Sequence, residues 1–207
     1  MIYVELRFPI IGDVIPRDHG RTMFRAISRL IPEAASADWL LVKHARSARR
    51  PCGALEILQP SRLRMRLPQS RVSLMLKLSG KRIDVGSHAV RFGTPEISLL
   101  KPCSSLYAKC VAVNGYSTEC AFLDALAWRL DEMGIGGEIE LGLRRRFRVG
   151  RRVITGFALT LHDMSEEGSI ALQEQGLGSY RHLGCGFFVP VLHKRTGNRR
   201  PFKKGRI

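Results

Sequence analysis

The sequence predicts an α+β fold in which one order of elements, β-α-β-β-α-β, is written twice along the chain. Three observations lead to this fold class. Apolar residues change repeatedly between the period of a strand and the period of a helix. Lys101 and Pro102 separate two stretches with the same element order. The 207 residues also suffice for two domains of about 100 residues each. We therefore expect two tandem ferredoxin-like (RRM-like) units with antiparallel sheets, over residues 1–101 and 102–207.

The first unit begins with an alternating, β-branched segment that predicts a strand over residues 2–11. Apolar residues at helical spacing then predict a helix over residues 20–31, with Asp18 as its N-cap and Pro32 at its end. The later elements of this unit are expected as a second strand over residues 39–44, a third strand broken at Pro60 into residues 55–58 and 63–67, a helix over residues 71–78 and a fourth strand over residues 89–100.

The second unit repeats this order after a strand expected over residues 107–113. Ser117 or Thr118 begins a helix that reaches Met133, and three glycines follow it. The remaining elements are expected as a hairpin of residues 138–149 and 153–162, a helix over residues 165–175 and a final apolar strand over residues 185–192.

A glycine-rich loop between the last helix and the last strand is the most informative motif. Two Gly-x-Gly pairs, Gly176 with Gly178 and Gly184 with Gly186, flank five residues. Three of these five can stack on, pair with or hydrogen-bond to a nucleotide: Tyr180, Arg181 and His182. A dinucleotide-binding loop needs a strand before it and a helix after it, and here the order is the reverse. A plain flexible turn is the alternative, but the basic and aromatic filling favours RNA binding.

Positive charge dominates the chain, with a formal net charge of +16 and 26 arginines among 34 basic residues. The planar guanidinium of arginine suits phosphates and base edges. Between Trp39 and Arg82 there are 11 basic residues and one acid, Glu56. Clusters of one sign indicate an extended anionic partner. The basic segments are not amphipathic helices with bulky apolar faces, so nucleic acid is favoured over a membrane surface.

The predicted hairpin carries six arginines that form a candidate RNA-binding surface: Arg144, Arg145, Arg146, Arg148, Arg151 and Arg152. On a strand, alternate residues share a face, so we expect a row of every second arginine there, with Phe147 pointing away. Arg62, Arg64 and Arg66 alternate in the same way. That second row is equally the polar outer face of a half-buried strand.

Five scattered cysteines and the absence of a Cys-x-x-Cys pair indicate neither a disulfide framework nor a zinc site. A reducing cytoplasm is therefore the expected location. No apolar run approaches the roughly 18 residues of a membrane span, and no signal-peptide layout is present at the N-terminus.

The pattern Gly-apolar-Gly, five residues, Gly-x-Gly resembles the signature of the repeat-associated RNA-binding superfamily of CRISPR systems. The length, the two expected units and a histidine at the first helix make the chain similar to the sixth Cas family, whose members cut CRISPR repeat transcripts. The segments Asp18-His19-Gly20 and residues 26–32 resemble the Myxococcus-type subgroup. The resemblance implies a CRISPR repeat RNA stem-loop as substrate, and other Cas proteins of an interference complex as further partners.

The resemblance further implies RNA cleavage without a metal or another cofactor. A 2′-hydroxyl attacks the adjacent phosphodiester and leaves a 2′,3′-cyclic phosphate and a 5′-hydroxyl. This reaction needs a base, an acid and cations around the phosphorane, and histidine fills either proton-transfer role.

Of six histidines, His19 is the leading catalytic candidate, because it opens the first helix and matches the family's usual position. His44, which ends the second strand beside Lys43, is a second candidate. His182 is an RNA contact or a third proton carrier. Family members place a tyrosine or lysine beside the histidine, and Tyr180, Lys43 and Arg21 are the candidates for that position.

Two alternatives stay open at this point. One is a catalytically silent RNA-binding subunit of a CRISPR effector complex. The other is a ribosomal or other housekeeping RNA-binding protein, whose charge would look similar.

Overall fold

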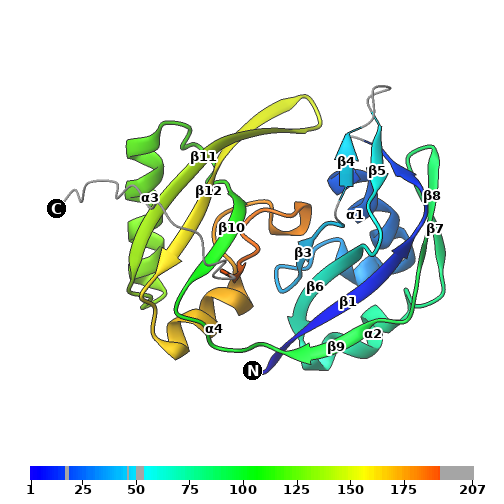
Figure 1. Cartoon of the computed structure of the whole chain (residues 1–207), viewed down its shortest axis with the longest axis horizontal. Helices are drawn as coiled ribbons and strands as arrows, with labels where there is room; N and C mark the ends of the chain where they lie inside the picture. Colours follow the sequence, from blue (N-terminus) through cyan, green and yellow to red (C-terminus); the bar gives the residue numbers. More distant parts are fainter. Residues whose placement is uncertain (17–18, 46, 50–53, 192–207) are drawn as a thin grey trace.

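The computed structural model describes residues 1–16, 19–45, 47–49 and 54–191, arranged as two halves that lie side by side (Figure 1). One cluster of buried apolar residues lies within residues 4–92 and a second within residues 106–188. The domain boundary expected after residue 101 falls between these clusters, and it stays a prediction. Every pair of named strands in the described part of the chain is antiparallel.

The first half is built around β1 (Tyr3–Ile11), which pairs with β6 (Arg62–Pro68) from Tyr3 to Pro9. The sheet runs β3-β6-β1-β8-β7, and β9 also pairs with β1. The other strands of this sheet are β3 (Leu41–Lys43), β7 (Arg82–Val85), β8 (His88–Phe92) and β9 (Glu96–Leu99). Its helices are α1 (His19–Leu30), η1 (Pro32–Ala34), η2 (Gln69–Arg71) and α2 (Val72–Leu76).

Helix α1 closes the first core because its apolar residues recur on one side. Met23, Ala26 and Ile27 are buried against the sheet residues Leu6 and Phe8. A small second sheet of β2 (Val14–Ile15), β5 (Leu55–Ile57) and β4 (Ser47–Arg49) stands at one end of this half (Figure 1). The packing of α1 fixes where its N-terminal residue His19 lies.

The second half has a four-stranded sheet in the order β11-β12-β10-β13. Its elements are β10 (Leu106–Val111), α3 (Glu119–Glu132), β11 (Glu138–Val149), β12 (Arg152–His162), α4 (Glu166–Gln175), η3 (Arg181–Leu183) and β13 (Val189–Pro190). Phe122 and Leu126 of α3 pack on Phe157 of β12 within the second core. Ser165 caps α4, since its hydroxyl accepts a hydrogen bond from the Gly168 N–H at 3.0 Å.

The second half follows the predicted order of elements. The first half departs from it, because β2, β4 and β7 were not expected and the two parts of the expected broken strand, β5 and β6, lie in different sheets. Three boundaries also differ. The strand expected over residues 89–100 is divided into β8 and β9, because the chain crosses from one end of β1 to the other between them. The last strand, expected over residues 185–192, is only β13. Phe187 and Phe188 are apolar because their side chains are buried, and they do not pair with another strand. The helix expected over residues 71–78 is shortened to η2 and α2.

Some predictions fall on residues that the structure does not describe. The N-cap proposed at Asp18 and the last residue of the expected final strand, Leu192, both lie outside the described residues. No helix in the described ranges has the length and apolar character to cross a lipid bilayer.

Candidate active site

The glycine-rich loop, residues 176–186, lies between the two halves of the molecule (Figure 1). It is fixed to β10, because the Gly186 N–H donates to the Cys110 carbonyl at 2.8 Å and the Ser179 N–H to the Ala112 carbonyl at 2.7 Å. Its short helix η3 contacts α1 and β3 of the first half. The loop therefore carries residues of the second half to the start of α1.

At this contact the imidazole rings of His19 and His44 meet edge to face. Their ring centroids are 5.0 Å apart and their planes are inclined by 86°. His19 is the first residue of α1, where the helix dipole favours a bound anion. His44 directly follows β3. The two leading catalytic candidates thus lie together, one on a helix terminus and one on a strand end.

His44 is enclosed by backbone from both halves. A Cβ added at Gly184 would stand 2.8 Å from Cδ2 of His44, and one at Gly20 would stand 3.1 Å from Nε2. Gly184 also has a left-handed φ of 94°. Burial, followed by the charges of His19 and His182, lowers the pKa of His44 to about 3, and the backbone of Leu183 opposes the shift. His44 is therefore neutral near pH 7.

Two aromatic contacts hold the loop's functional side chains. His182 packs against Phe24 of α1, with centroids 4.5 Å apart. Tyr180, in a left-handed conformation, meets Phe147 of β11 edge to face at 5.9 Å. Burial and the charge of Arg181 lower the pKa of His182. The residues His19, His44, Tyr180 and His182 are therefore brought to one region from both halves.

Arg181 and the loop glycines have partners within the protein. Arg181 Nη1 donates to the Gln175 carbonyl at 2.6 Å, so this guanidinium satisfies the end of α4. Four glycines of the loop have a positive φ: Gly176, Gly178, Gly184 and Gly186. Protein atoms fill the place of a Cβ at each of them, as the Leu41 side chain does 2.6 Å from such a carbon at Gly176. Packing of the loop therefore accounts for these glycines.

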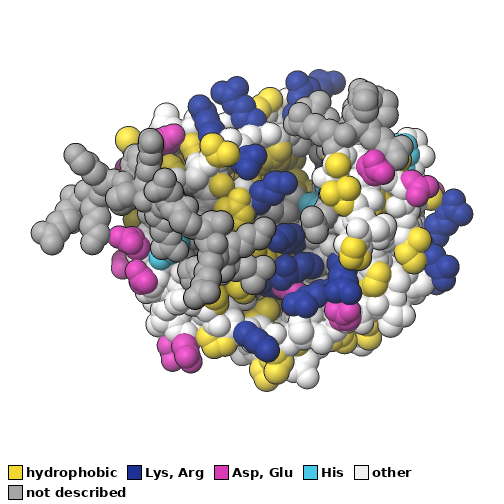
Figure 2. Space-filling view, in the orientation of Figure 1, with side chains coloured by type: hydrophobic (Ala, Val, Ile, Leu, Met, Phe, Trp, Pro, Cys, Tyr) yellow, Lys and Arg dark blue, Asp and Glu magenta, His cyan; other side chains and the backbone are white. Residues whose placement is uncertain are grey.

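A band of basic side chains, formed by Lys43, Arg64, Arg66 and Lys109, lies where the two halves meet. Figure 2 shows Lys and Arg side chains gathered over this junction. Burial, then the charges of Arg64 and Arg66, lowers the pKa of Lys43 to about 8; Lys109 adds to the lowering and Glu5 opposes it. Burial and the neighbouring cations together therefore outweigh the opposing effect of the Glu5 carboxylate. The band is therefore strongly electropositive.

Glu5 holds three of the nearby arginines in place. Arg64 binds it with two hydrogen bonds of 2.8 and 2.7 Å, Arg66 Nε lies 3.0 Å away and Arg7 Nε 2.6 Å away. Burial alone would raise the pKa of Glu5, but the hydrogen bond and charge of Arg64, with Arg66 and Arg7, hold it at about 2. Side-chain exposure therefore decreases along this row, from exposed Arg62 through Arg64 to fully buried Arg66.

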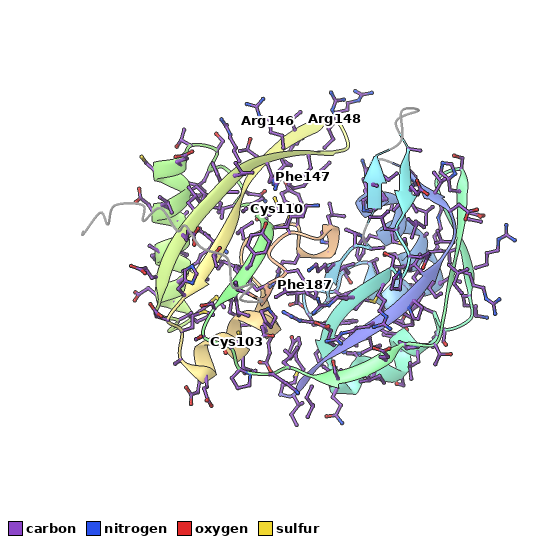
Figure 3. All side chains as sticks on the ribbon, in the orientation of Figure 1. Cys103, Cys110, Arg146, Phe147, Arg148 and Phe187 are labelled. Atoms are coloured by element: carbon purple, nitrogen blue, oxygen red, sulfur yellow. The ribbon has the colours of Figure 1, made fainter. Side chains whose placement is uncertain are left out.

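The arginine-rich hairpin β11–β12 presents two different faces (Figure 3). Arg144, Arg146 and Arg148 are exposed on one face, whereas Arg145 and Phe147 alternate with them and are half-buried, with Phe147 pointing toward the loop. Arg151 and Arg152 lie at the hairpin tip. A Cβ added at Gly150 would stand 2.8 Å from Nη1 of Arg21 on α1, so the tip reaches the first half.

Sequence reasoning missed several residues around the site. Phe24 and Phe147 carried no signal of their own, because their role depends on the loop that packs on them. Phe187 was expected on a strand, but it receives the guanidinium of Arg66 at 4.2 Å from its ring centroid. The alternation of arginines over residues 62–66 did indicate the basic band. The alternation alone does not distinguish an RNA-binding row from the polar outer face of a half-buried strand.

Comparisons with known proteins match this arrangement. The family model described as Cas6 Crispr matches residues 4–193. The CRISPR-associated endonuclease Cas6 of Myxococcus xanthus (strain DK1622) is 34% identical over 192 residues, which are 92% of this chain and 82% of that protein. A solved structure described as a RAMP protein binding different RNA substrates has a TM-score of 0.68 at 16% identity, covering 93% of this chain and 100% of the other.

A second solved structure, Cse3 of Thermus thermophilus bound to an RNA representing a pre-cleavage complex, has a TM-score of 0.53 at 15% identity. It covers 91% of this chain and 98% of the other. Together the solved structures confirm the predicted fold class, a protein of two tandem ferredoxin-like units. From the family match and the Myxococcus relative, the chain belongs to the Cas6 family of CRISPR-associated endoribonucleases.

Proposed function

We propose that this protein cuts CRISPR repeat RNA at the junction of its two halves, with His19 as a proton carrier and without a metal ion. The observation that carries the proposal is the position of His19, at the start of α1, against His44 and the η3 loop. An RNA phosphate at this helix terminus would meet the positive end of the helix dipole and an imidazole at once.

The reaction that fits these residues is transesterification within the RNA. The 2′-hydroxyl loses its proton to a base and its oxygen attacks the adjacent phosphorus. The bond to the 5′-oxygen breaks, this oxygen takes a proton from an acid, and a 2′,3′-cyclic phosphate remains. Histidine serves either transfer, and one such transfer contributes about 10²–10⁴-fold to the rate. We assign one of the two transfers to His19.

The other candidates take different roles in the proposal. His44, with a pKa of about 3, is a poor proton carrier near neutrality, so we assign it the positioning of the His19 ring. Tyr180 is the candidate from the second half for contact with the reacting phosphate. Lys43, Arg64 and Lys109 of the basic band would hold the RNA backbone, since their cations neutralise phosphates, while the buried Arg66 supports the band from below.

The arginine-rich hairpin extends this surface away from the reacting site. Its exposed row of Arg144, Arg146 and Arg148 suits the phosphates of a repeat stem-loop. The proposal also includes other Cas proteins of an interference complex as partners, which the family resemblance implies. It places the protein in the cytoplasm. The family match over residues 4–193 favours this function over a housekeeping RNA-binding protein.

A cleavage assay with repeat RNA in excess EDTA tests the proposal. We expect cutting by the wild type, no cutting when the scissile 2′-hydroxyl is replaced by hydrogen, and a cyclic phosphate on the product. His19→Ala should lower the rate at least about 100-fold while RNA affinity is kept. His88→Ala, on β8 away from the loop, is the matched control. Tight binding of RNA without cleavage by the wild type would instead support a silent subunit.

A further inference from the structure

Two cysteines face each other where the glycine-rich loop crosses β10, at the position of Cys110 in Figure 3. The Sγ atoms of Cys110 and Cys185 are 3.9 Å apart. Cys110 is half-buried and Cys185 is buried, and both are free thiols. The Gly186 N–H donates to the Cys110 carbonyl at 2.8 Å, so the two backbones are already held side by side. Since a disulfide has an S–S length of about 2.05 Å, the sulfurs need to approach by only about 2 Å.

The surroundings of Cys110 favour reaction at this sulfur. The register of β10 shifts between Ala108 and Val111, and Cys110 lies in this irregular segment. The absence of a side chain at Gly156 on β12 makes room for the Cys110 sulfur, because a Cβ at Gly156 would stand 2.8 Å from Sγ of Cys110. The hydrogen bond from Cys185 lowers the pKa of Cys110, burial opposes this, and Arg145 adds to the lowering. A thiolate is the reactive form of cysteine.

Cys185 is the complementary partner of this thiolate. Its hydrogen bond to Cys110, together with burial, raises the pKa of Cys185. One cysteine therefore reacts first and the other, still protonated and within reach, resolves the product. This division of roles is typical of cysteine pairs that oxidise reversibly.

We propose that Cys110 and Cys185 form a peroxide-sensitive modification site, whose disulfide slows RNA cleavage by displacing the loop that encloses His44. The Cys110 thiolate attacks one oxygen of hydrogen peroxide, which gives a sulfenic acid and, after protonation of the leaving hydroxide, one water. The Cys185 sulfur then attacks the sulfenic sulfur, loses its proton and expels a second water. Two thiols and one peroxide thus give one disulfide and two waters.

The disulfide is coupled to the active site through the neighbouring residue Gly184. Its backbone lies against the His44 ring, which in turn meets His19. The Cys185 N–H also donates to the Tyr180 carbonyl at 3.3 Å. Movement of Cys185 toward β10 therefore displaces the wall of the His44 enclosure and the Tyr180 turn. The effect on cleavage rests on the proposed function, whereas formation of the disulfide does not.

The test treats reduced full-length protein with hydrogen peroxide, removes the peroxide with catalase and blocks the remaining thiols. Peptide mass mapping without reductant should find Cys110 joined to Cys185. A displacement of about 1 Å near a reacting group can cost up to about 10²-fold in rate, so we expect single-turnover cleavage of repeat RNA to fall by at least ~10-fold. Dithiothreitol should restore it.

Three substitutions separate this site from general oxidation. Cys110→Ser should make the cleavage rate insensitive to peroxide, relative to the same variant untreated, and Cys185→Ala provides a second variant should the first fold poorly. Cys120→Ser, exposed on α3, should keep the full sensitivity. The proposal is overturned if no such disulfide forms, if it forms without slowing cleavage, or if Cys110→Ser remains sensitive. A protein that never cleaves RNA would count against the proposed function, and the peptide map would still decide the disulfide.

Discussion

The guanidinium carbon of Arg66 lies 4.2 Å from the ring centroid of Phe187, and this contact joins the two halves of the protein. Arg66 comes from β6 of the first half, and Phe187 directly follows the glycine-rich loop of the second. Nη1 of Arg66 also donates to the Gln173 carbonyl at 3.1 Å, and its Nε lies 3.0 Å from Glu5. A buried cation thus fixes the loop that completes the active site.

The first prediction concerns the stability that this contact provides. Arg66→Met should lower the free energy of unfolding by about 3 kcal/mol, because it removes a buried ion pair and a desolvated cation–π contact. Urea denaturation measures the loss. Arg62→Met is the control, since Arg62 pairs with Glu96 on the surface, 2.8 Å apart, and exposed pairs contribute at most about 1 kcal/mol. Equal losses for both variants would contradict a special role for Arg66.

The second prediction is a loss of stability in acid that depends on Glu5. Its pKa is about 2 in the folded protein against 4.5 for an ordinary glutamate, so the unfolded chain binds the proton more tightly. The contribution is complete above pH 4.5 and disappears as the pH falls toward 2; in full it is about 3 kcal/mol. Denaturation midpoints across this pH range should show the loss. Glu5→Gln, less stable at pH 7, should lack this part of the pH dependence.

The fold could be predicted because local periodicity carries it. The alternation along β1 and β6 and the helical spacing of Met23 and Ile27 are set by the side of each element that is buried. Residues 185–188 could not be placed by the same rule. Phe187 and Phe188 are apolar because one receives Arg66 and the other lies in the second core, and neither reason leaves a period in the sequence.

The site was partly predictable for a related reason. The position of His19 at a helix start follows from local sequence, and so does the arginine row of β11. The enclosure of His44 and its lowered pKa do not follow from local sequence, because they depend on Gly184, which approaches from the other half of the chain. The role of the loop glycines was equally hidden, since a glycine that admits a ligand and one that admits a protein carbonyl look the same in a sequence.

The third prediction is a loss of stability that depends on His44 and occurs at higher pH than the loss that depends on Glu5. The pKa of His44 is about 3 in the folded protein against 6.5 for an ordinary histidine. As the pH falls below 6.5 the unfolded chain takes up a proton that the folded chain does not, so stability falls. Between pH 6.5 and 4.5 this should cost about 2 kcal/mol. Urea titrations at several pH values should show the slope in the wild type and in Glu5→Gln, and its loss in His44→Leu.

The fourth prediction concerns the pH dependence of RNA binding. Since the pKa of Lys43 is about 8, its charge is lost as the pH rises from 7 to 9, and a phosphate contact is lost with it. Affinity for repeat RNA should fall over this range, and the salt slope should shrink by about 0.7–0.9. Lys43→Arg keeps its charge and should bind independently of pH there.

The matched control for Lys43 is Lys77→Arg, at the exposed end of α2. This variant should keep the pH dependence of the wild type. Isothermal titration calorimetry in buffers of different ionisation enthalpy should also detect proton uptake on binding near pH 8, because RNA phosphates stabilise the charged form of Lys43. An affinity that stays level from pH 7 to 9 in the wild type would exclude Lys43 from the RNA contact.

The fifth prediction divides the two faces of the hairpin. Arg146 and Arg148 are exposed and point away from the loop, whereas Phe147 between them packs on Tyr180 with ring centroids 5.9 Å apart (Figure 3). The double variant Arg146→Ala with Arg148→Ala should weaken RNA binding and reduce the salt slope by about 1.4–1.8, which is two phosphate contacts. Its cleavage rate at saturating RNA should change little, because neither side chain contacts the His19 region.

Phe147→Ala should do the opposite, leaving the salt slope unchanged and lowering the cleavage rate at saturating RNA, because Tyr180 loses its support. Arg82→Ala with Arg91→Ala is the matched control for charge, since these exposed arginines are paired across the β7–β8 hairpin of the first half. Filter binding at several salt concentrations and single-turnover cleavage give the two quantities separately. If the hairpin arginines and the control pair reduce the salt slope equally, attraction by net charge explains the binding, and the hairpin has no contact of its own with the RNA.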